Sequence, residues 1–233
     1  MAARALLVST ALAATSAAAQ PVEADADRPL SRAQTELFRT PHLANVRQPS
    51  ALLYDFTRYG PVGFTDRVTV QVREARADGT RDVAFEFLTG ERNERHPPVE
   101  GFSGNPILMI FLEHDVRTLK ESIGVSTTYW RNRLRDALLE SATVEDVTAT
   151  VDGRAVPARK VSVRPFEGED RLRRVPPVRD KLYTFVLADA VPGGIVEIRT
   201  DMPADAGLGV PAAGESLVFN RTQSQDAPGA AKP

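Results

Sequence analysis

The densest group of acid and base side chains in this sequence is Glu113-His114-Asp115. A histidine beside a carboxylate is a frequent general acid or base. The three residues lie in a segment with helical periodicity, where consecutive side chains point about 100° apart. They therefore cannot converge on one substrate atom. We interpret His114 as a half-buried histidine with a hydrogen-bonding neighbour, or as a surface residue.

Other patterns that would support catalysis or metal binding are incomplete. Ser103, in the segment 101–105, is nearest to the nucleophile elbow of a hydrolase, but the second glycine is missing at the required offset. His42, His96 and His114 are scattered, and the carboxylates follow no calcium-loop spacing. A pair of acids is inevitable among 31, so it does not indicate a glycosidase. We predict no catalytic residue, no metal and no cofactor, and an enzyme ranks third among the function classes.

The most basic stretch of the chain is residues 170–181, which contains Arg171, Arg173 and Arg174. Guanidinium groups suit carboxylate and phosphate, so this stretch could bind an anionic head group or an acidic partner. Neighbouring acids offset its charge, which favours the alternative of a solvated loop. The formal charge of the whole chain is −2, so nothing indicates binding to nucleic acid or to an anionic membrane.

Two proline pairs occur in similar settings. Pro97-Pro98 and Pro176-Pro177 are each followed by valine, and each comes after a predicted hairpin. They are either a duplicated hairpin-and-arm unit or a coincidence. In a duplicated unit we expect both segments to be extended, because proline fixes its own φ and restrains the residue before it. With the three arginines they are the candidate residues for docking a partner.

Hydrophobic periodicity defines the elements that would carry these residues. Aromatic side chains recur at every second or third position in 53–59. Apolar side chains alternate in 68–72 and 83–88, and Asp78-Gly79 between these two runs predicts a hairpin. Asn105 is a predicted N-cap, Pro106 a first helical residue and Gly124 a C-terminal glycine. The first turns of this helix are apolar nearly all round, which predicts deep burial. A second helix, to about residue 141, completes a helical hairpin.

Strands return after the helices. They flank Asp152-Gly153 and the turn at 192–194, and a closing strand is predicted near 215–222. We predict an α+β fold: a strongly bent antiparallel sheet of about eight strands, with the helical hairpin of residues 105–141 packed on one face.

The N-terminus is typical of an exported protein. Arg4 precedes an apolar run, and Ala17-Ala18-Ala19 fits a signal peptidase site, so we predict a signal peptide at 1–19 with cleavage near Ala19. The apolar run is too short for a membrane span. The chain has no cysteine, which excludes disulfides and fits a bacterial periplasm. The predicted parts are the signal peptide, an N-terminal arm at 20–50, one β-rich domain at 51–223 and a disordered tail at 224–233.

An open sheet around a helix resembles the periplasmic lipoprotein and lipid carriers, an analogy of fold without matched residues. We predict a soluble, non-catalytic periplasmic protein that binds or carries an apolar or amphipathic ligand between sheet and helix. The candidate ligand-binding residues are Ile107, Ile110, Phe111, His114 and Trp130. The alternative is an interaction module of an envelope assembly, which docks through sheet edges and the two proline segments. The sequence does not fix the oligomeric state.

Overall fold

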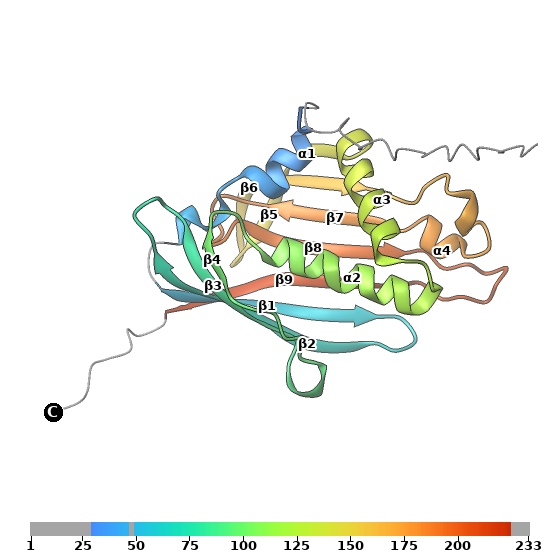
Figure 1. The fold of residues 1–233 in the computed structure, drawn as a ribbon, viewed down its shortest axis with the longest axis horizontal. Coiled ribbons are helices and arrows are strands. Elements are labelled where there is room, and N and C mark those ends of the chain that lie inside the picture. Colours follow the sequence, from blue (N-terminus) through green and yellow to red (C-terminus); the bar gives the residue numbers. More distant parts are fainter. Residues whose placement is uncertain (1–28, 47–48, 225–233) are drawn as a thin grey trace, which may run out of the picture.

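The computed structural model describes residues 29–46 and 49–224, which form one mixed α+β unit (Figure 1). A single antiparallel sheet of nine strands has the order β4-β3-β2-β1-β9-β8-β7-β6-β5. The strands are β1 (Ser50–Tyr59), β2 (Phe64–Ala75), β3 (Arg81–Phe87), β4 (Val99–Phe102), β5 (Thr143–Val151), β6 (Arg154–Val163), β7 (Leu182–Leu187), β8 (Ile195–Met202) and β9 (Ala213–Ser224). The longer helices are α2 (Ile107–Ile123) and α3 (Thr127–Glu140). The short helical turns are α1 (Arg32–Gln34), η1 (Thr35–Arg39), η2 (His42–Asn45), η3 (Gly90–Arg92), η4 (Asp170–Leu172) and α4 (Pro176–Arg179).

Hairpins build this sheet in two halves. Strands β1 to β4 pair in sequence order on one side, and β5 to β9 do so on the other. Pairing of β1 with β9 joins the halves, with Tyr54 opposite Phe219. Among the described residues no ladder joins β4 to β5, so the sheet is open. The predicted α+β class and the turns at Gly79 and Gly153, both with positive φ, are confirmed.

The ninth strand, β4, is absent from the sequence prediction. It has only four residues, contains Gly101 and directly follows the exposed Pro97-Pro98. Short length and nearby proline are typical of an edge strand, and they leave no period to detect. It pairs with β3 through Val83 opposite Val99.

The second proline segment is not extended, so that prediction is wrong. Pro176–Arg179 is the helical turn α4, and Pro177 is buried. Proline fits the first turn of a helix because the missing N–H has no partner there. Pro97 and Pro98 lie in no helix or strand and are exposed, so the two segments differ in conformation and do not repeat a unit.

The start of α2 differs by one residue from the prediction. Pro106 occupies the cap position, and the helix begins at Ile107. The side chain of Asn105 still accepts a hydrogen bond from the Ile107 amide at 3.2 Å. Its Nδ2 donates to Tyr54 Oη at 3.1 Å and to the Gly193 carbonyl at 2.9 Å. Asn105 therefore ties the start of the helix to β1 and to the β7–β8 turn.

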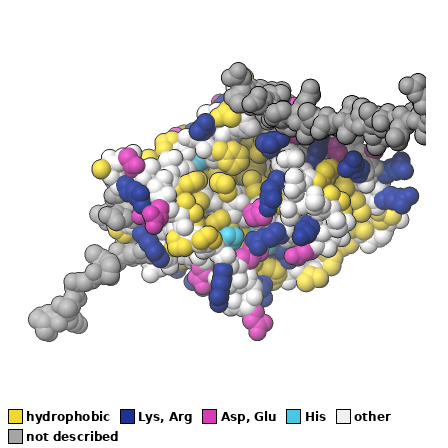
Figure 2. All heavy atoms as spheres, in the orientation of Figure 1, with side chains coloured by type: hydrophobic (Ala, Val, Ile, Leu, Met, Phe, Trp, Pro, Cys, Tyr) yellow, Lys and Arg dark blue, Asp and Glu magenta, His cyan; other side chains and the backbone are white. Residues whose placement is uncertain are grey.

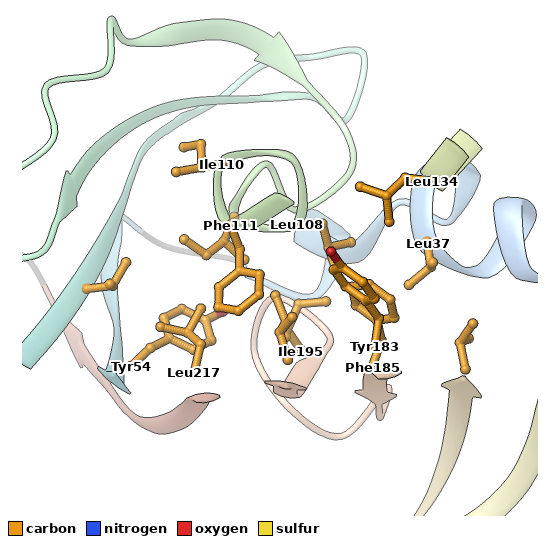
Figure 3. Packing of buried hydrophobic residues seen from close by; sticks show 14 of the residues in the cluster. Leu37, Tyr54, Leu108, Ile110, Phe111, Leu134, Tyr183, Phe185, Ile195 and Leu217 are labelled. Carbon is orange, nitrogen blue, oxygen red and sulfur yellow. The ribbon is translucent and has the colours of Figure 1, made fainter. Parts of the chain in front are cut away.

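The two long helices cross one face of the curved sheet (Figure 1). Figure 3 shows Phe111 pointing from α2 towards Tyr54 and Leu217 on the sheet. All three side chains are fully buried, and each such burial stabilises the fold by about 1.5–3 kcal/mol. The helical hairpin thus packs on one face of the sheet, as predicted. The hydrophobic core of the protein lies between the helices and the sheet.

The N-terminal arm takes part in this core. Ser31 caps α1 in a capping box with Gln34, and its Oγ donates to the Leu138 carbonyl of α3 at 2.7 Å. Ala33 and Leu37 are each 1% exposed. The helical turn α1 of this arm therefore packs on α3. The predicted signal peptide at 1–19 and almost all of the predicted tail lie outside the described residues. No helix in the described ranges is long and apolar enough to cross a membrane.

Candidate functional site

The predicted ligand-binding residues are part of the packed core. Ile107, Phe111 and Trp130 are fully buried, and Ile110 is 8% exposed. The Trp130 ring lies 4.9 Å from that of Phe166, centroid to centroid. These side chains fill the space between hairpin and sheet. The two hollows described below are lined by other residues.

His114 lies in an ionic cluster that the sequence did not reveal. Its Nδ1 donates to Glu94 Oε1 at 2.5 Å, and its Nε2 is 3.3 Å from Glu215 Oε1. Arg58 Nε donates to the same Glu215 oxygen at 2.7 Å. We call Arg58, Glu94, His114 and Glu215 the ionic cluster. It joins α2 to β1, to β9 and to the segment before β4.

The sequence neighbours of His114 point elsewhere, as the helical period predicts. Glu113 accepts two hydrogen bonds from Arg131 of α3, at 3.0 and 2.7 Å. Asp115 pairs with Lys181 and accepts a hydrogen bond from Tyr183 Oη at 2.5 Å. Glu113, His114 and Asp115 thus take part in three separate sets of contacts.

The charges of the ionic cluster are fixed near neutral pH. Burial by itself lowers the pKa of His114, but hydrogen bonds to Glu215 and Glu94 outweigh it and raise that pKa to about 9. Burial by itself raises the pKa of Glu215, yet the His114 hydrogen bond and nearby positive charges bring it to about 2. His114 is therefore an imidazolium whose N–H groups face carboxylates. This arrangement holds α2 in place and leaves no nitrogen to accept a proton.

The first hollow, which we call the mouth pocket, lies under α2 at the ends of β1, β8 and β9. Its volume is about 230 Å³. Pro61, Val62 and Met202 provide apolar walls, and Lys181 and Glu215 are among its charged lining residues. The lining residues come from distant parts of the chain, among them Arg58, Asp115, Lys181 and Glu215, so sequence spacing gave no signal for this site.

The second hollow, which we call the helix groove, lies between η1, α2 and α3 and has a volume of about 410 Å³. Its apolar lining residues are Phe38, Met109, Leu112, Val116, Leu134 and Leu138. Met109 is 57% exposed and Phe38 is 39% exposed. Figure 2 shows hydrophobic side chains gathered on the face of the molecule that carries the helices.

The helix groove explains why the first turns of α2 are apolar nearly all round. One side packs on the sheet, and the other lines the groove. The prediction of deep burial is therefore wrong for Met109. The sequence shows that these turns are apolar on all sides. It does not show which of their side chains are exposed, because that depends on where α3 and η1 pack.

The predicted docking residues lie in separate places. Pro97 and Pro98 precede β4, whereas Arg171, Arg173 and Arg174 lie beside α4, well apart from β4 in Figure 1. All three arginines are exposed. The described ranges hold no group of three or more histidines and acids placed for a metal ion.

No protein-family model matches the sequence, and no curated protein matches it. Several solved structures are similar at low identity. The lipoprotein LppX of Mycobacterium tuberculosis is 12% identical, with a TM-score of 0.35 over 84% of this chain and 97% of that one. The MucA/MucB complex of Pseudomonas aeruginosa gives 18% identity and a TM-score of 0.37, over 86% of this chain and 59% of that one.

A LolA superfamily protein of Nitrosomonas europaea, NE2245, is 8% identical, with a TM-score of 0.23 over 84% of this chain and 94% of that one. TM-scores of this size are too low to transfer a function. We therefore infer the function from the residues of this chain.

Proposed function

We propose that the protein binds an amphipathic molecule without catalysis, and that the apolar part of this molecule lies in the helix groove. The observation that carries the proposal is a hollow of about 410 Å³ with six apolar lining residues. Ligand pockets have volumes of roughly 300–1,000 Å³. Covering exposed apolar surface contributes about 25 cal/mol per Å², so the exposed Met109 and Phe38 favour an apolar occupant.

The charged rim of the groove supports an amphipathic ligand over a purely apolar one. Arg131 and Arg135 of α3 both line the groove, beside Glu113 of α2. A guanidinium binds carboxylate or phosphate through paired N–H groups, as Arg131 already binds Glu113. A fatty-acid-like molecule could thus place its chain along Met109 and Leu134 and its acidic head at the arginines.

The proposed location is the periplasm. Residues 1–19 have the pattern of a cleavable signal peptide, and the chain has no cysteine. In this compartment such a protein would carry its ligand through an aqueous space.

The alternative to the helix groove is a deeper binding mode, between the helical hairpin and the sheet. If the helical hairpin lifts from the sheet, Ile107, Ile110, Phe111, His114 and Trp130 become the ligand contacts. What supports this is their position between the hairpin and the sheet. What opposes the movement is the ionic cluster, together with the buried pair of Asp115 and Lys181.

Fluorescence titration with a dansyl-labelled undecanoic acid tests the groove. We expect enhanced, blue-shifted emission with the purified protein. Met109→Glu places a charge in the apolar lining and is expected to weaken binding at least about tenfold, a change of ~1.4 kcal/mol. Val62→Glu is the matched control, because Val62 is also apolar and is 78% exposed but lies outside the groove. Equal affinities for the wild type and Met109→Glu would contradict the proposal.

A further inference from the structure

Three connections between strands meet at one end of the sheet. They are the β1–β2 turn, the β8–β9 loop and the β6–β7 connection, at residues 60–63, 203–212 and 164–181. The strand registers place them together. Tyr59 at the end of β1 lies opposite Gly214 near the start of β9, and Leu182 at the start of β7 lies opposite Asp201 near the end of β8. Figure 1 shows all three connections on the right, and we call this end of the sheet the turn end.

Two of these connections carry exposed apolar side chains. Val62 of the β1–β2 turn is 78% exposed, and in the β8–β9 loop Leu208 is 57% and Val210 is 40% exposed. The two connections lie against each other, because a Cβ atom at Gly60 would be 2.9 Å from the Cβ of Ala213. Turns are usually built from small and polar residues. Aliphatic side chains gathered on adjacent turns therefore indicate a contact surface.

The β8–β9 loop holds Leu208 in a well-defined turn. Asp205 and Val210 exchange backbone hydrogen bonds of 2.8 and 2.9 Å. The Asp205 carboxylate accepts a further hydrogen bond from the Leu208 amide at 3.1 Å, and Gly209 has the positive φ that this turn requires. These contacts use the backbone of Leu208 and leave its side chain exposed. Because the turn is already ordered, little conformational entropy is lost when the side chain binds.

The β6–β7 connection supplies positive charge at the same end. Its exposed charged residues are four arginines and two acids: Arg164, Arg171, Arg173, Arg174, Glu167 and Asp170. The other two acids are already paired. Glu169 binds Arg133 of α3 at 3.0 Å, and Asp180 binds Arg179 at 2.8 Å. In the part of the chain that the structure describes, no acid forms an ion pair with the arginines at 171–174. Figure 2 shows Lys and Arg side chains gathered at this end of the molecule.

Apolar side chains beside unpaired arginines fit a phospholipid surface. Aliphatic side chains leave water when they enter the acyl region, and guanidinium groups bind phosphate through paired N–H groups. Only β9 and β8 separate β1 from β7, so the two kinds of side chain are about 14 Å apart along the sheet. We infer that the turn end docks on an anionic membrane surface, with Val62 and Leu208 among the acyl chains and the arginines at the phosphates.

This docking is a local property of the turn end. The whole chain has a formal charge of −2, which gives no overall attraction to an anionic surface. None of the residues assigned to the docking lines the helix groove. The docking therefore does not depend on the ligand proposed for the groove.

Sedimentation with large unilamellar vesicles tests the inference. We expect the protein to bind vesicles of equal parts phosphatidylcholine and phosphatidylglycerol in about 0.1 M NaCl, where charges act over roughly 10 Å. Binding to vesicles of phosphatidylcholine alone should be at least about fivefold weaker, because the arginines lose their anionic partners. Absence of binding to the anionic vesicles, or equal binding to both kinds, would overturn the inference.

A matched pair of variants locates the apolar contact. Leu208→Glu places a charge at the tip of the β8–β9 loop and should weaken binding to the anionic vesicles at least about tenfold. Met109→Glu is the control, because Met109 is also 57% exposed but lines the helix groove. It should leave vesicle binding unchanged, although it weakens the proposed groove ligand. Equal vesicle binding by the two variants would overturn the inference.

The arginines are tested as a set. Replacing those at 171, 173 and 174 by glutamine should lower binding to the anionic vesicles to the level of phosphatidylcholine vesicles. The control removes the same charge from exposed arginines outside the three connections, with the substitutions Arg39→Gln, Arg73→Gln and Arg154→Gln. The control should retain most of the binding. An equal loss in the control would show that only the net charge of the chain matters, and would overturn the inference.

Discussion

Lys181 and Asp115 form an ion pair that is almost wholly buried, with side chains 4% and 2% exposed. The pair joins the residue before β7 to the middle of α2, and Tyr183 donates a further hydrogen bond to Asp115. Charges in such surroundings are tolerated only when each is paired. The contact therefore fixes the position of α2 on the sheet and, with it, both hollows that flank the helix.

Removal of one partner of this pair should destabilise the protein strongly. We expect Lys181→Met to lower the free energy of unfolding by about 3–5 kcal/mol, because Asp115 is left as an unpaired buried charge. Urea denaturation measures the change. Lys160→Ala is the control: its pair with Glu145 is exposed and should contribute less than ~1 kcal/mol. Similar losses of unfolding free energy in both variants would show that burial of the Lys181–Asp115 pair does not affect stability.

Stability should depend on pH through the ionic cluster. The pKa of His114 is raised to about 9, so its contribution is complete below the unfolded value of about 6.5 and is lost as pH rises through 9. The pKa of Glu215 is lowered to about 2, so its contribution is complete above the unfolded value of 4.5 and is lost as pH falls through 2. We expect the largest contribution between pH 4.5 and 6.5.

Urea midpoints at pH 3, 5.5, 8 and 9.5 test this dependence. His114→Gln should flatten the alkaline decline, because the titrating group is gone. A wild-type midpoint that stays constant from pH 5.5 to 9.5 would show that His114 does not have the raised pKa.

A mutation at Phe111 distinguishes ligand binding in the helix groove from ligand binding in the core. Phe111→Ala should lower the free energy of unfolding by about 3–5 kcal/mol, since its side chain is fully buried. The milder Phe111→Leu should leave affinity for the dansyl-labelled acid unchanged. A large loss of affinity in folded Phe111→Leu would instead place the ligand between the hairpin and the sheet, as the sequence predicts.

Local patterns account for what the sequence could predict. Strands with alternating apolar residues and the turns at Gly79 and Gly153 can be predicted because a few neighbouring residues determine each of them. The same holds for the helical hairpin, in which Gly124 ends the first helix. The edge strand β4 was missed because four residues beside two prolines carry no period.

The ionic cluster could not be predicted, because its members are distant in the chain. Glu94 and His114 are separated by 20 positions, and His114 and Glu215 by 101. Only the pairing of β1 with β9 brings Glu215 beside Arg58 and under α2. The helix groove likewise depends on where η1 and α3 pack, which the period of α2 does not determine.

Photocrosslinking tests the central proposal most directly. A fatty acid with a diazirine near the end of its chain would be irradiated with the purified protein, and labelled peptides would be mapped by mass spectrometry. Binding in the helix groove predicts adducts on the segments around Phe38, Met109 and Leu134, which excess unlabelled fatty acid removes. Adducts spread over the surface, or displaced to the sheet strands and unaffected by competitor, would contradict it.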